Sequence, residues 1–259
     1  MKAPSPSSLT GSHGDLSERL LASGSVALSG KNFTGADFRG ANLRGVSVVH
    51  ASLAGARLDG ADFTGAQFLY VDLTHASFAH ARLDAARFEY VHAGAACFTH
   101  ASATNARWEH SDFTAASFTN ASLAKSVMRA CTLESARLDG ADLTDGSLAY
   151  CNCEAATFRG TLLKNTDTIA AQFAGADFAG ALQFFRCREI VVEVLRREAG
   201  NDFEMIKLIG AAQEVSNWCY AQWRTYLRDY PEYMRKALAI LARYPGSGAM
   251  EALRDGWVG

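Results

Sequence analysis

Hydrophobic residues recur every five positions through more than half of the chain. From Phe33 to Phe178, 30 residue numbers end in 3 or 8, and 25 of these positions carry Phe, Leu, Met or Trp. The position two residues earlier is small in almost every unit, and 19 of those 30 positions carry Ala. No insertion or deletion disturbs the register. Neither the 3.6-residue period of a helix nor the two-residue period of a strand produces this pattern.

A period of five requires a turn in every unit, with one large and one small side chain pointing inwards. Four units then close a square coil of 20 residues, and coils stack at the strand spacing of about 4.8 Å. Thirty units at four per coil predict about 7.5 coils and a prism roughly 36 Å long. Residues 20 apart therefore lie above one another on the same face.

Several units share a pattern of a small residue, Asp or Asn, Leu or Phe, usually a polar residue, and often Gly. The clearest are Ala36–Gly40, Ala41–Gly45, Ala61–Gly65, Ala141–Asp145 and Ala176–Gly180. In this pattern, residues 31–180 resemble the pentapeptide-repeat family. The resemblance implies a mainly β fold, a right-handed quadrilateral parallel β-helix. It says little about function, because one fold serves many functions.

The period of five ends near Gln183, and the remaining residues form helical patterns. We expect a flexible segment over residues 1–24, the β-helix over 25–182 and an α-helical region over 183–259. A stacked solenoid needs caps at its ends, and this helical region is long enough to cap the prism, to form a homodimer, or both. The large side chains expected in the cap or dimer contact are Trp218, Tyr220, Trp223, Tyr226, Leu238 and Leu241. Helices are predicted at Arg188–Ala199, Phe203–Ala212, Ser216–Arg228 and Pro231–Tyr244, with short ones at 15–21 and 250–255.

One face of the prism differs from the other three, whose outward residues are mostly Thr, Ser, Asn, Asp and Gly. Its corner column is aromatic, and charged residues stand beside that column. The candidate protein-contact residues on this face are His50, Leu69, Tyr70, Arg87, Glu89, Tyr90, Arg107, Glu109, His110 and Tyr150. Exposed aromatic patches often mark interaction sites, which favours a partner or a second copy of the chain.

Two other interpretations of the aromatic face stay open. In the first, the face has a role within the chain: either the C-terminal region covers it, or the rings only stabilise neighbouring coils. In the second, the aromatic column is a coincidence. Rings that repeat about every 5 Å suit offset stacking. Arg87 with Glu89, and Arg107 with Glu109, are expected to form solvated charge pairs that contribute little to stability.

The predicted interior contains one compensated irregularity. Ala93 and Ala103 are undersized for their positions, and Trp108 in the same coil is oversized. Close packing therefore predicts that Trp108 fills the space left by the two alanines.

The six cysteines are expected to be buried apolar thiols. Cys131 and Cys151 stack within disulfide reach, but a reducing compartment favours free thiols. His80 and His100 also stack, and the sequence supplies no evident further ligands for a metal ion.

Charge and motifs exclude several functional classes. The chain has 25 Lys and Arg against 27 Asp and Glu, a net charge of −2, which argues against direct nucleic-acid binding. No apolar stretch is long enough to cross a membrane and no secretory signal is recognisable, so we expect a cytoplasmic protein. No nucleophile elbow, phosphate loop, dinucleotide-binding or zinc-protease motif occurs. We therefore expect neither an enzyme nor a cofactor.

The favoured function is a non-catalytic protein-binding scaffold or adaptor whose partner is unidentified. The resemblance implies one alternative, a DNA-mimicking binder of bacterial DNA gyrase or another type II topoisomerase that protects against quinolones or a toxin. Duplex DNA as long as the prism would carry about 20 negative charges. Residues 31–178 have 15 acidic and 12 basic residues, a net charge of −3, which fits such mimicry poorly. A host-directed effector is a further possibility that no residue pattern favours.

Overall fold

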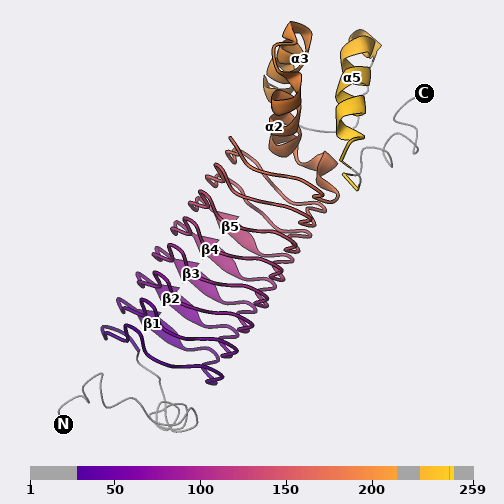
Figure 1. Ribbon diagram of the computed structural model, residues 1–259. Helices are drawn as coiled ribbons and strands as arrows, with labels where there is room; N and C mark the ends of the chain where they lie inside the picture. Colours follow the sequence, from indigo (N-terminus) through magenta and orange to yellow (C-terminus); the bar gives the residue numbers. More distant parts are fainter. Residues whose placement is uncertain (1–27, 215–227, 245, 248–259) are drawn as a thin grey trace, which may run out of the picture.

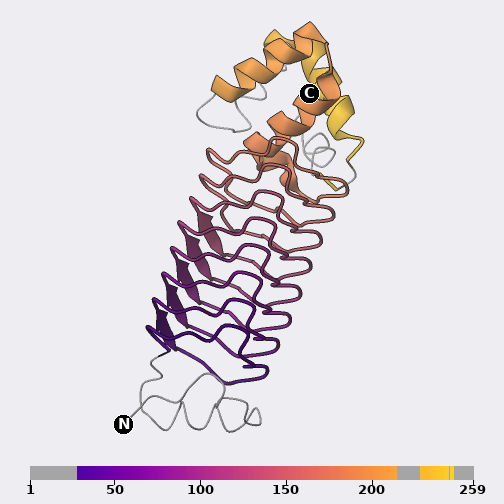
Figure 2. The same cartoon turned by 60° about the vertical axis from the view of Figure 1, so that its left-hand side comes forward.

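A computed structural model describes residues 28–214, 228–244 and 246–247. The chain winds into a long four-sided coil, with helices at its C-terminal end (Figure 1 and Figure 2). Parallel backbone bridges join residues 20 apart, from Asn32 and Ser52 to Leu162 and Leu182. The predicted parallel β-helix and its 20-residue coil are therefore confirmed.

One face of the coil carries regular strands, and the other three are joined by single bridges. The strands are β1 (Ser47–Val49), β2 (Gln67–Leu69), β3 (Arg87–Glu89), β4 (Arg107–Glu109) and β5 (Val127–Arg129). They form one parallel sheet in the order β1-β2-β3-β4-β5, stacked along one side of the rod (Figure 1). Each residue pairs with the one 20 positions later, as Phe88 pairs with Trp108. This face is the one that the sequence singles out as aromatic.

The corners of the coil explain why the strand face is different. At an ordinary corner, the Ala36 amide donates to the Phe33 carbonyl at 2.9 Å, and Gly35 has a positive φ of 68°. A positive φ at the second central residue is typical of a type II turn. In the described part of the chain, the corners at His50, Tyr70, Tyr90, His110 and Ala130 lack this closing bond. These corner residues keep a positive φ, but the three residues before each of them are extended and form one strand on each coil.

Large side chains fill the interior in continuous columns. Phe88 stacks between Phe68 and Trp108, with ring centroids 4.6 and 4.1 Å apart. Trp108 is fully buried, and so are Ala93 and Ala103 in the same coil. Its indole Nε1 has no hydrogen-bond partner among the described atoms. The large and small residues therefore share one packed layer, and the compensating role of Trp108 stays a prediction.

The five described cysteines are all free thiols. Four are buried as predicted, whereas Cys97 is partly exposed and Cys219 lies outside the described residues. The buried thiols are Cys131, Cys151, Cys153 and Cys187. The Cys131 thiol donates to the Trp108 carbonyl at 3.1 Å. Burial, together with the nearby Glu189 and Asp167 carboxylates, raises the pKa of Cys187 to about 12.

The described C-terminal residues form the 3-10 turn η2 (Phe184–Arg186) and the helices α2 (Arg188–Ala199), α3 (Phe203–Glu214) and α5 (Pro231–Leu241). The first predicted helix is confirmed. The second extends two residues beyond its predicted end, and the last stops at Leu241 rather than at Tyr244. The predicted helices at 15–21 and 250–255, and all but the final residue of the one at 216–228, lie outside the described residues. None of the described helices is long and apolar enough to cross a membrane.

The helices close the C-terminal end of the prism. Phe184 is fully buried between Phe178 of the last coil and Tyr244, at 6.3 and 5.9 Å. The Thr168 hydroxyl donates to Glu189 at 2.6 Å, and the Gly175 amide donates to Glu193 at 3.2 Å. The apolar residues of α2 join the same continuous core as the prism. The apolar groups that the last coil would expose are therefore covered, and two of its polar groups, the Thr168 hydroxyl and the Gly175 amide, are hydrogen-bonded.

Replacing Trp108 by Ala should lower the free energy of unfolding by roughly 3–5 kcal/mol, as large-to-small core changes do. Trp108→Phe should cost much less, because Phe keeps the stacking on Phe88 and removes the unpartnered indole N–H. Chemical denaturation of both variants measures the difference. An unchanged unfolding midpoint for Trp108→Ala would contradict the packing role.

Stability should fall at alkaline pH because of the buried thiols. The Cys187 pKa is about 12 in the folded protein against an ordinary 9.0, so the neutral thiol stabilises the fold fully below about pH 9. Between pH 9 and 12, this contribution is lost at about 1.4 kcal/mol per pH unit. Cys187→Ala should therefore show a shallower decline than wild type when unfolding free energies are measured from pH 8 upwards. Parallel declines would show that Cys187 does not titrate as described.

Candidate functional site

An aromatic ladder runs along the corner of the strand face. It consists of His50, Tyr70, Tyr90 and His110, whose successive ring centroids lie 5.0, 5.1 and 5.2 Å apart. The ring planes differ by 3°, 13° and 10°, so the predicted stacking is confirmed. Tyr70 is 49% exposed and Tyr90 is 45% exposed. Tyr150 lies further along the same column, where Arg129 stands 5.0 Å from its ring centroid.

The backbone holds the ladder in a conformation that suits glycine better than aromatic residues. The four ladder residues have φ between 51° and 54°, in the left-handed region. Non-glycine residues rarely adopt this region. Many other corners of the described prism carry glycine there, and others carry residues such as Ala85 and Asn105. Each ladder amide donates to the next coil, as Tyr70 does to the Glu89 carbonyl at 3.1 Å. The parallel register thus places the four rings directly above one another.

Two columns of like charge stand beside the ladder. Arg87 pairs in register with Arg107, and Glu89 pairs with Glu109, on β3 and β4. We call these two pairs the charged columns. Both lie on the outward side of the sheet, flanking the buried side chains of Phe88 and Trp108.

The predicted charge pairs within the strands are wrong. Among the described residues, neither Arg87 with Glu89 nor Arg107 with Glu109 forms an ion pair. Two residues along a strand span about 6.6 Å, whereas like charges on neighbouring strands are about 4.8 Å apart. Bending two exposed side chains together would gain less than about 1 kcal/mol. The charged columns therefore present unpaired charge to whatever lies in front of this face.

The described helices do not cover the strand face. Helices α2, α3 and α5 lie beyond the end of the prism, while β1–β5 run along its side (Figure 2). The expected covering by the C-terminal region is therefore not provided by these three helices. The ladder and the charged columns are open in the described part of the structure.

The remaining predicted contact residues fall into two groups. Trp218, Tyr220, Trp223 and Tyr226 lie outside the described residues. Leu241 is fully buried and Leu238 is partly buried against the core, so both contribute to packing within the chain.

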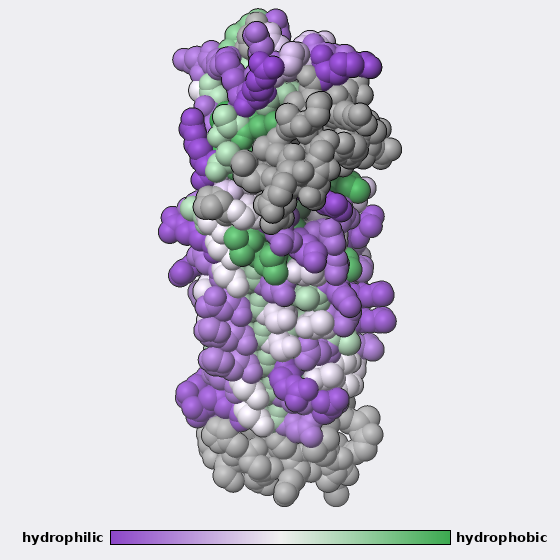
Figure 3. All heavy atoms as spheres, turned by 90° about the vertical axis from the view of Figure 1, so that its right-hand side faces the viewer, coloured by the Kyte–Doolittle hydropathy of each residue, from purple (hydrophilic) through white to green (hydrophobic). Residues whose placement is uncertain are grey.

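The sequence reading did not select several exposed apolar side chains. Near the prism's C-terminal end and on α3 these are Ile169, Leu182, Phe203 and Ile206. Figure 3 shows hydrophobic surface near the junction of the prism and the helices. Ile169 lies in the same column as Leu69 and Glu89, because their numbers differ by multiples of 20. This spacing was the one feature of the sequence that could have placed Ile169 on the strand face.

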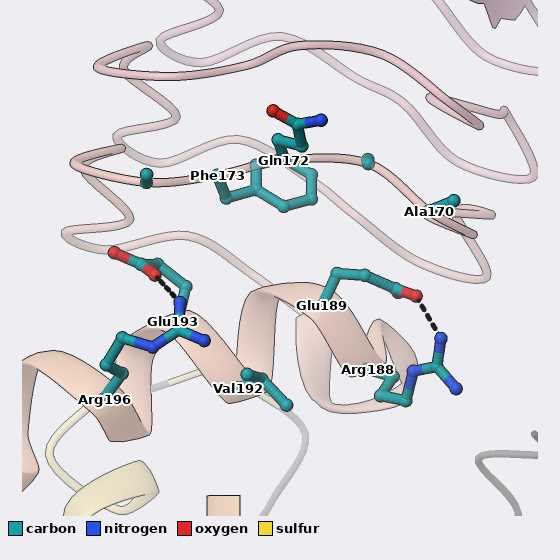
Figure 4. Close-up of a pocket in the computed structure, with 10 residues that line it drawn as sticks. Ala170, Gln172, Phe173, Arg188, Glu189, Val192, Glu193 and Arg196 are labelled. Carbon is teal, nitrogen blue, oxygen red and sulfur yellow. Dashed lines mark hydrogen bonds and ion pairs between the residues drawn. The ribbon is translucent and has the colours of Figure 1, made fainter. Parts of the chain in front are cut away.

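A hollow of about 370 Å³ lies between the last coil and α2 (Figure 4). Its charged lining residues pair with one another. Arg188 contacts Glu189 at 2.8 Å, and Arg196 contacts Glu193 at 2.9 Å. In the described parts of the chain, no group of three or more His, Cys, Asp or Glu residues is arranged to hold a metal ion. The hollow therefore offers little chemistry for catalysis, and the strand face is the stronger candidate site.

Replacing Tyr90 by Gly should change the free energy of unfolding by less than about 1 kcal/mol, because two effects oppose each other. Loss of the ring contacts costs about 0.5–1.5 kcal/mol, and relief of the left-handed backbone returns about 1 kcal/mol. Phe88→Ala, at the buried neighbour, should cost several times more. A loss above about 2 kcal/mol in chemical denaturation of Tyr90→Gly would show that the ladder is needed for folding.

Comparisons with known proteins agree with this geometry. A family model described as "Pentapeptide repeats (8 copies)" matches residues 26–53, 51–89, 96–134 and 111–149. No curated protein sequence matches the chain.

Solved structures similar to this chain include full-length QnrB1, a plasmid-mediated fluoroquinolone resistance protein. It is 15% identical, the match covers 62% of this chain and 96% of that one, and the TM-score is 0.35. HetL, a pentapeptide repeat protein involved in heterocyst differentiation regulation in the cyanobacterium Nostoc sp. strain PCC 7120, is 20% identical. That match covers 63% of this chain and 94% of HetL, with a TM-score of 0.22. The five-residue period, the four-sided coil and the family model together show that this chain carries pentapeptide repeats, which the family model matches over residues 26–89 and 96–149.

Proposed function

We propose that the protein is a non-catalytic binding scaffold that recognises a protein partner through the strand face. One observation carries the proposal: four stacked rings stand exposed at backbone positions that favour glycine. His80 and His100 stack at similar corners of another face, so a stacked pair alone does not mark a site. The ladder differs in having four successive rings, two of them exposed tyrosines, and tyrosine supplies a large contact area with few rotatable bonds.

The composition of the face supports the same role. Arg87, Arg107, Tyr70 and Tyr90 are of the residue types that contribute most binding energy in protein interfaces. The unpaired charged columns add specificity, since a partner gains by presenting opposite charges to them. The strands hold both sets of side chains in a rigid register, which reduces the entropy lost on binding.

Other features fit a scaffold better than an enzyme. The interior of the prism is filled by stacked rings, Leu and Ala, and the charges around the hollow are paired. The buried free thiols suit a reducing compartment, which supports a cytoplasmic location. In this proposal the C-terminal helices cap the prism, and their expected role in dimerisation stays a prediction.

Gyrase binding by DNA mimicry has weaker support. Several acidic groups on the prism are held by arginines, as Asp37 is by Arg39 at 2.6 Å and Asp177 by Arg159 at 2.7 Å. The Ala179 amide and Arg159 lower the pKa of Asp177. Asp177 is therefore charged, and both carboxylates are neutralised locally by their arginines. A rod of this kind lacks the dense negative field of a duplex.

The test uses a matched pair of variants of the full chain. Tyr70→Gly with Tyr90→Gly removes the middle of the ladder. His80→Gly with His100→Gly removes another stacked, exposed pair, 5.0 Å apart, from a different corner. We expect a specific protein to be retained from bacterial extract by immobilised wild type and by the histidine variant, and lost from the tyrosine variant. Equal retention by all three proteins would contradict binding through this face.

A gyrase supercoiling assay with and without a quinolone distinguishes the alternative. Under the scaffold proposal, micromolar protein should neither inhibit supercoiling nor protect it. Inhibition or protection would instead favour the gyrase-binding alternative, despite the nearly balanced charge.

A further inference from the structure

We infer that the occupant of the strand face is a second copy of this chain, packed face to face with its prism parallel to the first. This inference rests on the proposed function, because it names the partner of the same surface. The two-fold axis would run along the prism, in front of the line of Phe88 and Trp108. The argument comes from the arrangement of charge and of side-chain size on either side of that line.

Charge on this face is self-complementary about that axis. Arg87 and Glu89 flank Phe88 on opposite sides, and Arg107 and Glu109 flank Trp108 in the same way. A two-fold axis along the prism exchanges the two sides and keeps each coil at its own height. Each arginine of one copy then faces the equivalent glutamate of the other. Four intermolecular pairs form in these two coils from groups that have no ion-pair partner within the described chain. In the next coil, Arg129 follows Glu109 in its column and faces Val127, so it adds no pair.

Side-chain size is complementary about the same axis. The ladder rises along the corner that follows each strand. The corner that precedes each strand carries exposed residues that are small in the same coils, namely Gly45, Gly65, Ala85 and Asn105. The two-fold axis brings the tall corner of one copy against the low corner of the other. The rings therefore find room where a second aromatic column would clash.

The alternative arrangements of two copies are unfavourable. An axis running across the face would reverse one prism and place Arg87 opposite Arg107, so like charges would meet. Moving this axis to another height changes which coils meet, but every column still faces its own copy, so the ladder meets the other copy's ladder. An unrelated partner has no need for both signs of charge at equal distances from one line. The observed symmetry therefore favours a second copy over another protein.

The contact is modest in size. Four coils at about 4.8 Å give a patch roughly 20 Å high, and the five residues of one face make it no wider than about 17 Å. Its area is therefore well below the about 800 Å² per partner of a standard stable interface. Much of its attraction comes from exposed charges, which salt screens. We therefore expect a reversible dimer that forms in the micromolar range and weakens as salt is added.

Charge reversal tests the inference on the full chain by sedimentation velocity at low salt. Arg87→Glu with Arg107→Glu should weaken self-association at least about tenfold, equivalent to 1.4 kcal/mol. Glu89→Arg with Glu109→Arg should do the same. An equimolar mixture of these two variants should restore the dimer, because one copy then presents only glutamates and the other only arginines. The matched control is Arg57→Glu with Arg82→Glu, which makes the same charge change on other faces and should leave the dimer intact.

Three results would overturn the inference. The wild type stays monomeric, both reversed variants dimerise as well as wild type, or their mixture fails to dimerise. Melting curves show whether each variant folds. If Glu89→Arg with Glu109→Arg does not fold, Glu89→Gln with Glu109→Gln takes its place and is also expected to weaken the dimer. A dimer that persists in every variant would indicate contact elsewhere, such as through the C-terminal helices. A monomeric chain that still binds another protein through the ladder would overturn the inference and leave the proposed function standing.

Discussion

Stacking of 20-residue coils in exact vertical register is the constraint on which the whole structure depends. Every backbone bridge joins positions 20 apart, so the neighbour of each side chain is known from its number alone. Inside the prism this register places ring on ring, as at Phe68, Phe88 and Trp108. Because each coil uses the same inward positions, a core builds up without contacts between distant parts of the sequence.

The same register shapes the surface. An outward residue meets its own equivalent on the next coil, so aromatic side chains form a ladder and like charges form columns. Elsewhere on the prism, acidic residues bond to a following Thr or to a nearby Arg, as Asp62 does with Thr64 and Arg44. The charged columns of the strand face have no such partners in the described chain. A surface that is rigid, aromatic and incompletely neutralised is suited to binding.

The C-terminal region solves the problem that stacking creates. The last coil would expose its inward rings, and Phe184 with the apolar side of α2 covers them. Glu193 is 6% exposed there, yet Arg196, Arg197 and the Gly175 amide all contact its carboxylate. Burial of this charge is therefore compensated, and the junction between prism and helices is polar as well as apolar.

The sequence alone determined the coil, the inward columns, the stacked ladder, the buried thiols and the start of most described helices. These features depend on spacing within a unit or between units 20 residues apart, and spacing can be counted. The tertiary structure decided how far each side chain is exposed and which charges meet. In the structure, Arg87 and Glu89 form no ion pair. Their backbone positions lie further apart along the strand than the positions of like residues on neighbouring coils. The tertiary structure also placed α2 over the last coil, since packing of a non-repeating helix against a repeating prism follows from three-dimensional shape rather than from any period in the sequence.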